Sequence, residues 1–449
     1  MISLARKLRL ADFFSLGFGT MIGVGWLVVM DDWLTRGGPL GAVLGFAIGG
    51  AVLLPIGIVY GHLVRAMPDA AGEIAYTAAV FPRSVSFATG WMMLLAYYIV
   101  CPWEAVAIGR IAGYLFPALN SIELYRVAGK PVYLPHLVIG LALTGFLTVV
   151  NYRGIRLSAT FQNWTTFGVI ALTLGFVSAG ASHGSAANFQ PLFNGPAIIS
   201  VLLVLQVVPY FMMGFESIGK ASEEASTEFE PQQFMVAILL AIMVGAAFYA
   251  TVTAAVAYVA PWQSLVHERF ATAVAFERAM GSRWIVRVIM AAALLSLLKV
   301  FNGNLVAASR MLFALGRRGL TDSRLGYVHP INRTPSTAVL CVGIATALLM
   351  PAGQSVLVPI TEVGSLAAAL GWMASCAAYL QMRPSILGRA AAATGLVVTS
   401  LMILMKVPPT VPGHFTIYEW IALAAWLVLG LLLRREAETR EAAVASDNH

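Results

Sequence analysis

The sequence predicts an all-α membrane protein with twelve transmembrane helices. Of its 449 residues, 59% are hydrophobic and only 11% are charged, and the mean hydropathy is +0.81. This composition is typical of a polytopic membrane protein and argues against a soluble enzyme. About 20 apolar helical residues are enough to cross the hydrocarbon core of a bilayer. The stretches that meet this length are 12–35, 39–64, 86–116, 134–151, 157–180, 197–222, 233–260, 284–315, 336–351, 355–381, 387–407 and 415–433.

The basic residues indicate how these helices are oriented. With the N-terminus in the cytoplasm, 18 of the 28 lysines and arginines fall in inside segments and eight in outside segments. Because cytoplasmic loops are enriched in Lys and Arg, we expect both termini to be cytoplasmic in a multi-pass protein of the cytoplasmic (inner) membrane. The same distribution accounts for the net charge of +7 without a nucleic-acid partner. Residues 1–435 are predicted to form one membrane domain, and 436–449 a polar cytoplasmic tail.

The first span contains a glycine-rich interruption, Met21-Ile22-Gly23-Val24-Gly25-Trp26. Two glycines one residue apart weaken the helix at a depth where a membrane strongly favours one. Unwound backbone is tolerated there only if it is buried in protein or lines a polar cavity. The interruption therefore predicts a binding site, and close packing through small residues is the alternative explanation.

The sixth span contains a second interruption, between Pro209 and Glu216. A proline removes a backbone donor, Gly214 loosens the helix, and Glu216 places a carboxylate where an ion is costly. If the first ten spans divide into five and five, both interrupted helices open their halves and the second half is inverted. Such pairs are typical of the binding sites of secondary transporters. The predicted halves are 12–180 and 197–381, followed by two more helices in 387–433.

Interrupted helices also predict how a small ligand is held. The N–H groups at a half-helix N-terminus suit a carboxylate, and the freed carbonyls suit a cation or an amine. Two facing interruptions could thus hold both ends of an amino acid.

Several motifs follow one another in order along nearly the whole chain. They are Gly19–Gly25, Met67–Tyr76 with Phe81-Pro82 and Gly90-Trp91, Gly214-Phe215-Glu216 with Glu223-Glu224, and Ser309-Arg310-Met311 with Gly319-Leu320 and Arg333-Thr334-Pro335. Together they resemble the motifs of the amino acid–polyamine–organocation (APC) permeases. The resemblance implies the LeuT-type fold, with five plus five inverted helices and two added ones, and alternating access without ATP.

The resemblance also implies roles for single residues. By position, Val24, Gly25 and Trp26 correspond to the backbone that grips a substrate carboxylate. Tyr210 matches an aromatic residue that covers the substrate from outside. Glu216 matches an acid implicated in proton sensitivity in some relatives. The full predicted substrate site comprises Ile22, Gly23, Val24, Gly25, Trp26, Glu104, Tyr210, Gly214 and Asn304.

Three residues depart from the family pattern. Val24 stands where a small residue, often Ser, is usual, and Trp26 stands where a small or aliphatic residue is commoner. Asn304 holds a pocket-facing position that is a Trp in an arginine-selective relative, which argues against an arginine substrate. We therefore expect substrate identity to be decided around these positions, Glu104 and Tyr210.

Lys299 and Glu104 are predicted to lie deep in the eighth and third helices. Lys299 is too deep to reach the membrane surface unless it meets a cavity. Its ammonium could replace a sodium ion or release a proton during transport, or it could pair with a carboxylate such as Glu104. Glu104 could instead receive a substrate amine or carry a proton. Lys299, Glu216 and Glu104 are thus the predicted coupling residues.

From these patterns we expect a secondary active transporter of amino acids, proton-coupled and sodium-independent. An exchanger of amines, polyamines or amino acids is the alternative, followed by a substrate sensor that does not transport. The expected partners are an amino acid or amine, protons and membrane lipids. We expect no enzyme activity, since no nucleophile and base are aligned, and no cofactor. The three cysteines form no ligand-spaced cluster, so no metal site is predicted.

Overall fold

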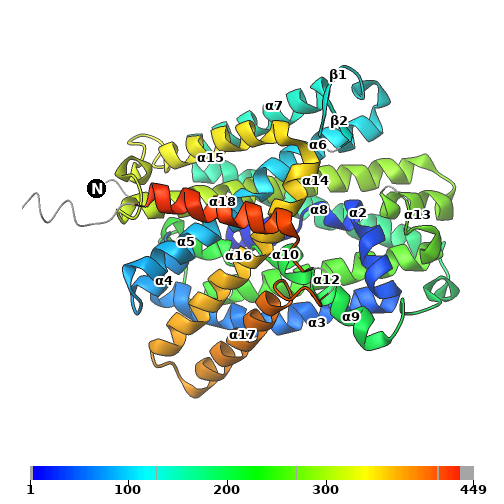
Figure 1. The fold of residues 1–449 in the computed structure, drawn as a ribbon. Helices are drawn as coiled ribbons and strands as arrows, with labels where there is room; N and C mark the ends of the chain where they lie inside the picture. The colour runs from blue at the N-terminus through cyan, green and yellow to red at the C-terminus, as the bar shows by residue number, and fades with distance from the viewer. Residues whose placement is uncertain (1–3, 128, 269, 412–413, 435–449) are drawn as a thin grey trace, which may run out of the picture.

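Long apolar helices make up nearly all of the structure, which is a computed structural model (Figure 1). It describes residues 4–434 except 128, 269, 412 and 413, and only the backbone of 354–361. The predicted tail, 436–449, lies outside the described residues.

A helix or a group of helices occupies each predicted span. They are α1 (Leu10–Met21) with α2 (Gly25–Val28), α3 (Met30–Ala66), α5 (Arg83–Tyr98) with α6 (Val100–Leu115), α7 (Leu134–Arg153), α8 (Ile155–Gly180), α9 (Ala197–Leu205) with α10 (Val208–Met212) and α11 (Ser217–Lys220), α12 (Gln233–Val259), α14 (Arg283–Arg317), α15 (Ser336–Leu349), α16 (Gly353–Gln381), α17 (Ile386–Leu404) and α18 (Ile417–Leu433). The connections contain α4 (Glu73–Ala78), α13 (Ala271–Met280) and six short 3-10 helices, η1 (Pro117–Leu119), η2 (Ala186–Phe189), η3 (Ser222–Glu224), η4 (Trp262–Ser264), η5 (Ser323–Gly326) and η6 (Met350–Ala352).

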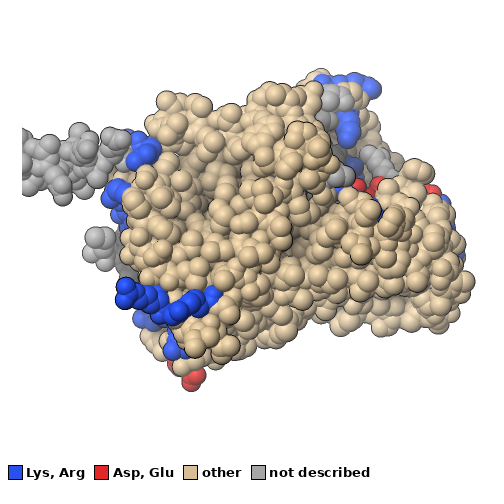
Figure 2. Space-filling model, turned by 60° about the horizontal axis from the view of Figure 1, so that its bottom comes forward, with Lys and Arg blue, Asp and Glu red and all other residues tan. Residues whose placement is uncertain are grey.

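The lengths and surfaces of these helices fit a membrane protein. Within the described residues, eight helical segments are long and apolar enough to cross a bilayer, and a ninth span results if Ala197–Leu205 and Val208–Lys220 are counted together. The number of twelve spans therefore remains a prediction. Large apolar side chains such as Trp164 (79% exposed) and Leu432 (77% exposed) face outward, as lipid contact requires. Figure 2 shows Lys and Arg toward the ends of the visible face, with uncharged residues between them.

One small β-hairpin interrupts the all-helical pattern that the sequence predicts. Strands β1 (Glu123–Val127) and β2 (Lys130–Tyr133) pair antiparallel between α6 and α7. Gly129 has a φ of 77°, a left-handed conformation that glycine adopts without strain. Most of the hairpin residues are exposed, so no alternating apolar face marks the strands in the sequence.

One end of the bundle gathers residues 4–9 and the segments 67–72, 221–232 and 318–335, and is called the N-terminal face below. Backbone hydrogen bonds fix the start of the chain there, because Lys7 and Leu8 both donate to the carbonyl of Glu224 at 2.8 and 2.9 Å. The N-terminus and this group of loops lie at the left of Figure 1, while the hairpin and α13 lie toward the other end, the opposite face.

A buried polar network joins α7, α8 and α14 near the middle of the bundle. The Asn302 side chain accepts a hydrogen bond from Asn151 at 2.8 Å and donates one to Gln162 at 2.8 Å. Gln162 in turn donates to the backbone carbonyls of Ser15 and Lys299, at 3.2 and 3.0 Å. Each amide is buried, so the network holds α1 and α14 at a fixed spacing.

Candidate functional site

The first interruption lies where the sequence predicts it. Helix α1 ends at Met21, Ile22 is extended with φ −92° and ψ 96°, and helical backbone resumes at Gly25. The N–H groups of Val24 and Gly25 are at the start of this new segment and carry no hydrogen bond within the described chain. They are therefore free to bind an acceptor.

The freed carbonyls of this interruption are already bound by side chains of other helices. Ser296 donates to the carbonyl of Gly23 at 2.9 Å and to that of Ile22 at 3.2 Å, and the Lys299 ammonium also donates to Ile22. Asn304 donates to the Thr20 carbonyl at 3.2 Å. Side chains of α14 thus take up acceptors that buried backbone cannot leave unpaired.

The second interruption lies against the first. Met213 is extended (φ −71°, ψ 146°) and Gly214 has a φ of 129°. A Cβ added to Gly214 would lie 2.7 Å from the Met21 nitrogen and 2.8 Å from the Thr20 carbonyl carbon, so only glycine allows the two segments to meet here. Across the same contact, the Ser217 hydroxyl donates to the Thr20 hydroxyl at 3.3 Å.

A cavity of about 320 Å³ lies beside both interruptions. Its inner wall is formed by apolar side chains, by the backbone of the first interruption and by Glu104. Toward the opposite face it is lined by charged residues, and there the side chains of Asp32 and Glu362 are 43% and 40% exposed. The cavity therefore reaches solvent on that side. Its lining includes Gly23, Val24, Gly25, Val28, Val100, Trp103, Glu104, Arg110, Tyr210, Phe211 and Val300.

The structure divides the predicted substrate residues into two groups. Gly23, Val24, Gly25, Glu104 and Tyr210 line the cavity, whereas Ile22, Trp26, Gly214 and Asn304 are not among its lining residues.

Each residue of the second group has another contact. The Trp26 indole stacks on Phe176 at 5.7 Å and packs edge-on against Phe248 at 6.1 Å. Its own carbonyl accepts a hydrogen bond from Thr272 at 2.6 Å. Asn304 is 1% exposed and binds backbone carbonyls, so both residues support the interruption from behind.

Sequence reasoning missed Phe211, whose ring lies against Gly25. A Cβ on Gly25 would collide with this ring, so glycine is required here for a close approach. Phe211 also packs edge-on against Trp33 at 4.9 Å. The aromatic pair Tyr210-Phe211 within an interrupted span was the signal that could have identified both residues.

Glu104 and Lys299 lie on two sides of the first interruption. Lys299 is fully buried, donates to the Ile22 carbonyl and lies 5.2 Å from the Phe18 ring centre. Glu104 is 3% exposed, lines the cavity, and its Oε2 has no hydrogen-bond partner among the described residues. No ion pair of 4.0 Å or less joins the two side chains within the described residues, but their opposite charges interact electrostatically, so the predicted pairing stays a prediction.

Glu216 lies in a buried cluster on the other side of the interruptions. Its Oε2 accepts a hydrogen bond from the Gly214 N–H at 3.0 Å, and its Oε1 is unpaired among the described atoms. The Lys220 ammonium donates to Glu73 and to the Glu216 carbonyl, and Glu73 also accepts from Tyr60 at 2.8 Å. This cluster places two carboxylates and one ammonium out of contact with solvent.

Ion pairs close the N-terminal face. Arg310 and Glu224, both without exposed side-chain area, form a bidentate pair with N–O distances of 2.9 and 3.3 Å. Arg317 bridges Glu223 and Asp69. These contacts join α14 to the segments 67–72 and 221–232, so the molecule is closed on this side and accessible on the other.

The pKa of Asp69, in the loop after α3, follows from these contacts. Burial alone would raise the pKa, but the N–H of Ala71, at 2.8 Å, and the guanidinium groups of Arg318 and Arg317 hold it below the usual value. For Glu224, burial raises the pKa and the neighbouring Arg310 opposes this. Both shifts thus arise where these loops meet the end of α14, which carries Arg310 and Arg317.

A comparison with known families agrees with this geometry. Residues 8–432 match the family model described as amino acid permease. The chain belongs to that family. As an amino acid permease it is a non-enzymatic membrane transporter, and the resemblance to APC permeases that the sequence motifs indicate is confirmed.

Individual relatives of this permease carry different named substrates. The branched-chain amino acid permease BcaP of Bacillus subtilis (strain 168) is 27% identical over 376 residues, which cover 81% of this chain and 77% of the relative. A methylthioribose transporter of the same organism is 25% identical over 447 residues, covering 96% and 93%. The chloroplastic cationic amino acid transporter 9 of Arabidopsis thaliana is 29% identical over 341 residues, covering 73% and 58%.

Proposed function

We propose that the chain is a secondary active transporter that carries an amino acid across the cytoplasmic membrane by alternating access. The observation that carries this proposal is the cavity of about 320 Å³ at the meeting point of two interrupted helices. Its volume is at the lower end of the range for small-molecule sites, which suits one amino acid. Two inverted repeats, 12–180 and 197–381, with both termini in the cytoplasm, complete the proposed architecture.

The substrate carboxylate would bind the N–H groups of Val24 and Gly25. Both groups lack partners in the described chain and carry a partial positive charge at the start of a helical segment. Glu104, on the same inner wall beside Gly23, would receive the amine. The apolar wall formed by Val28, Val100 and Val300 favours an aliphatic side chain, and one relative is named for branched-chain amino acids.

Sodium independence is proposed from the position of Lys299. Its ammonium and the Ser296 hydroxyl already occupy the Ile22 carbonyl, an acceptor that a bound sodium ion would otherwise use. Proton coupling is proposed for Glu104 and Glu216, because each carboxylate is buried with one oxygen unpaired among the described atoms. Lys299 is the third residue proposed for charge handling.

Uptake by proteoliposomes tests the proposal. We expect the purified protein to accumulate a labelled branched-chain amino acid when a pH gradient, acidic outside, is imposed, and to be indifferent to a sodium gradient. Lys299→Met is expected to abolish this uptake while the protein remains folded. Uptake that follows sodium and ignores pH would reject the coupling, and no uptake of any of the twenty amino acids would reject the substrate class.

A second function is favoured by the unpaired carboxylate of Glu104. An acid that faces the cavity suits a substrate with a net positive charge, and several relatives are named cationic amino acid transporters. The chain would then exchange amines or cationic amino acids. Entry of labelled substrate that requires unlabelled substrate inside the liposomes, with no entry into empty liposomes even under a pH gradient, distinguishes this exchanger from a symporter.

A further inference from the structure

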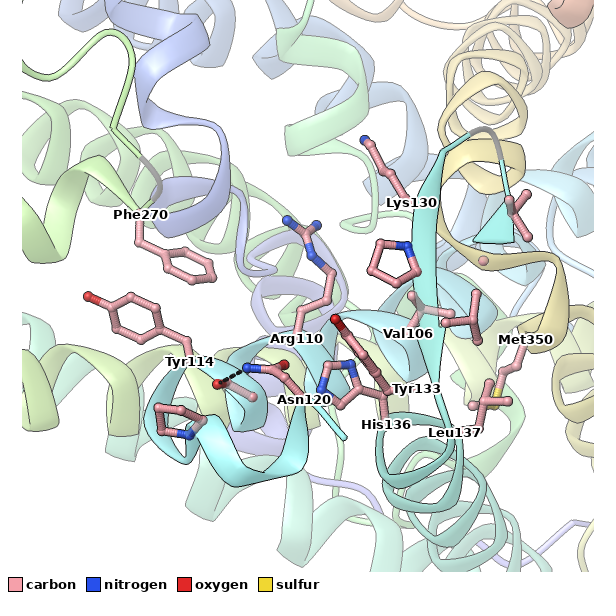
Figure 3. Close-up of a pocket in the computed structure, with 16 residues that line it drawn as sticks. Val106, Arg110, Tyr114, Asn120, Lys130, Tyr133, His136, Leu137, Phe270 and Met350 are labelled. Carbon is pink, nitrogen blue, oxygen red and sulfur yellow. Dashed lines mark hydrogen bonds between the residues drawn. The ribbon is translucent and has the colours of Figure 1, made fainter. Parts of the chain in front are cut away.

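A second and larger cavity lies at the opposite face, between α6, the hairpin and the start of α7. Its volume is about 940 Å³. Figure 3 shows the side chains of Arg110 and Lys130 directed into it, with Tyr133 and His136 on one side and Tyr114 and Phe270 on the other. None of these residues except Arg110 lines the central cavity.

The charge of this peripheral cavity is positive. Arg110 and Lys130 carry the charge, His136 adds ring nitrogens, and no Asp or Glu is among the described residues that line it. Three acidic residues of the neighbouring loops are already paired within the described chain: Glu123 with Arg126, Glu268 with Arg278, and Glu277 with Arg283. An anion that enters the cavity would therefore meet two cationic side chains and no carboxylate among the described lining residues.

Apolar and aromatic groups form the rest of the wall. The rings of Tyr114 and Phe270 meet edge-on at 4.9 Å, and those of Tyr133 and His136 at 5.2 Å. Val106, Leu137 and Met350 complete this surface. A ligand here can thus bury an apolar body while its charged end meets the cations.

The hairpin is fixed over the cavity by contacts with a distant part of the chain. The Tyr125 hydroxyl donates to the Pro351 carbonyl at 2.7 Å. A Cβ on Gly353 would lie 3.5 Å from Val132 and 3.8 Å from Val127, so the start of α16 packs closely against both strands. These contacts hold both strands of the hairpin, and with them the backbone that carries Lys130, against the start of α16.

We propose that this peripheral cavity binds an amphipathic oxyanion, a carboxylate or phosphate joined to an apolar body, with Arg110 and Lys130 as its anion-binding residues. The ligand comes either from solution, as a carboxylate, or from the membrane, as the phosphate of a lipid. This site does not depend on the transport function proposed above, although the two cavities share Arg110.

Binding measurements on the full chain in nanodiscs test the site. In phosphatidylcholine nanodiscs, hexanoate is titrated and its effect on thermal unfolding is measured. In a second arm, phosphatidylglycerol is added to the nanodiscs and bound lipid is counted by native mass spectrometry. We expect Lys130→Glu to weaken binding of at least one probe by tenfold or more, and the arm that responds identifies the source of the ligand.

Arg126→Glu is the matched control, because it changes the charge of the same hairpin equally but does not line the cavity. It is expected to leave both probes bound. Val106→Trp, which adds bulk to the apolar wall without changing its charge, is expected to weaken binding as well. The proposal would be overturned if wild type and Lys130→Glu bound the probes equally in both arms. It would also be overturned if Lys130→Glu and Arg126→Glu lost probe binding to the same extent. These outcomes are independent of whether the protein transports amino acids.

Discussion

Glu104 illustrates how a single side chain can decide what enters the central cavity. Among the described residues it is the one acid on the inner wall beside the first interruption, and its Oε1 lies 3.0 Å from where a Cβ on Gly23 would stand. A carboxylate in this position attracts an ammonium and repels a second carboxylate. The nearby Lys299 is turned to the Ile22 carbonyl and leaves the acid facing the cavity.

Glu104→Gln is expected to weaken substrate binding because the amide keeps the shape and loses the charge. A charge-assisted hydrogen bond contributes roughly 1.5–3 kcal/mol, which corresponds to an increase in KM of about tenfold or more. The measurement is the concentration dependence of uptake, with thermal unfolding as a test of folding. Glu123→Gln, on the exposed hairpin, is the matched control. An unchanged KM in Glu104→Gln would remove this residue from substrate recognition.

The sequence predicted which residues belong near the site better than it predicted which way their side chains point. The sequence located the glycines and Glu104 because each is unusual in an apolar span. It could not tell that Trp26 and Asn304 lie outside the cavity wall, because the helical period fixes their directions only relative to their own helices, and the sequence does not fix how those helices are rotated against the cavity. The pairing of Arg310 with Glu224 was likewise not predictable from the sequence, although both residues belong to the motifs that indicate the family.

At the scale of elements, the two interrupted spans act as one unit. Both breaks were predictable from glycine and proline, whereas their contact depends on the positive φ of Gly214, a feature of the folded chain. Side chains of α14 bind the carbonyls of the first break, and Gln162 of α8 joins that helix to α1. Long apolar helices thus hold a short non-helical segment in place.

Gly214→Ala is expected to disrupt this contact. The added Cβ would overlap the backbone of Thr20 and Met21, and the φ of 129° is strained for any other residue. Backbone strain of this kind costs roughly 1–3 kcal/mol before the overlap is counted. We expect a lower unfolding temperature and at least tenfold slower uptake. Gly175→Ala, in α8 with open space around it, is expected to be neutral or slightly stabilising. Similar behaviour of the two variants would contradict the close approach.

The whole molecule is asymmetric, with a closed N-terminal face and a cavity that reaches solvent toward the opposite face. The family relationship was recognisable from the ordered motifs, but which face is closed was not. That asymmetry arises from ion pairs between segments far apart in the sequence, such as Arg310 with Glu224 and Arg317 with Asp69. Opening the N-terminal face requires these pairs to separate.

Removing one partner of the buried Arg310–Glu224 pair is expected to cost about 3–5 kcal/mol, because the remaining charge stays buried without a counter-ion. Glu224→Gln and Arg310→Met should therefore each lower the unfolding temperature in detergent. The double variant should recover part of the loss, because no charge is left unpaired. Additive losses in the double variant would contradict a direct pair.

The pH dependence of the closed face follows from the lowered pKa of Asp69. A carboxyl group with a lowered pKa stabilises the folded state above its ordinary pKa, near 4, and loses this contribution as the pH falls through the lowered value. The Asp69 contacts therefore stay intact from pH 5 to pH 8. We expect Asp69→Ala to lower stability by about 1 kcal/mol at every pH in this range and to leave the pH profile of uptake unchanged. A shifted profile would place a titrating group in this loop.

Lys299 has a thermodynamic consequence for the whole transport cycle. The Lys299 side chain is covalently attached to α14, so unlike a bound sodium ion its nitrogen cannot leave the carbonyl of Ile22 and cross the membrane. For the same reason it performs no osmotic work, because it does not move from one compartment to the other. Any uphill movement of substrate must be driven by a different particle, one that crosses the membrane and is released on the far side.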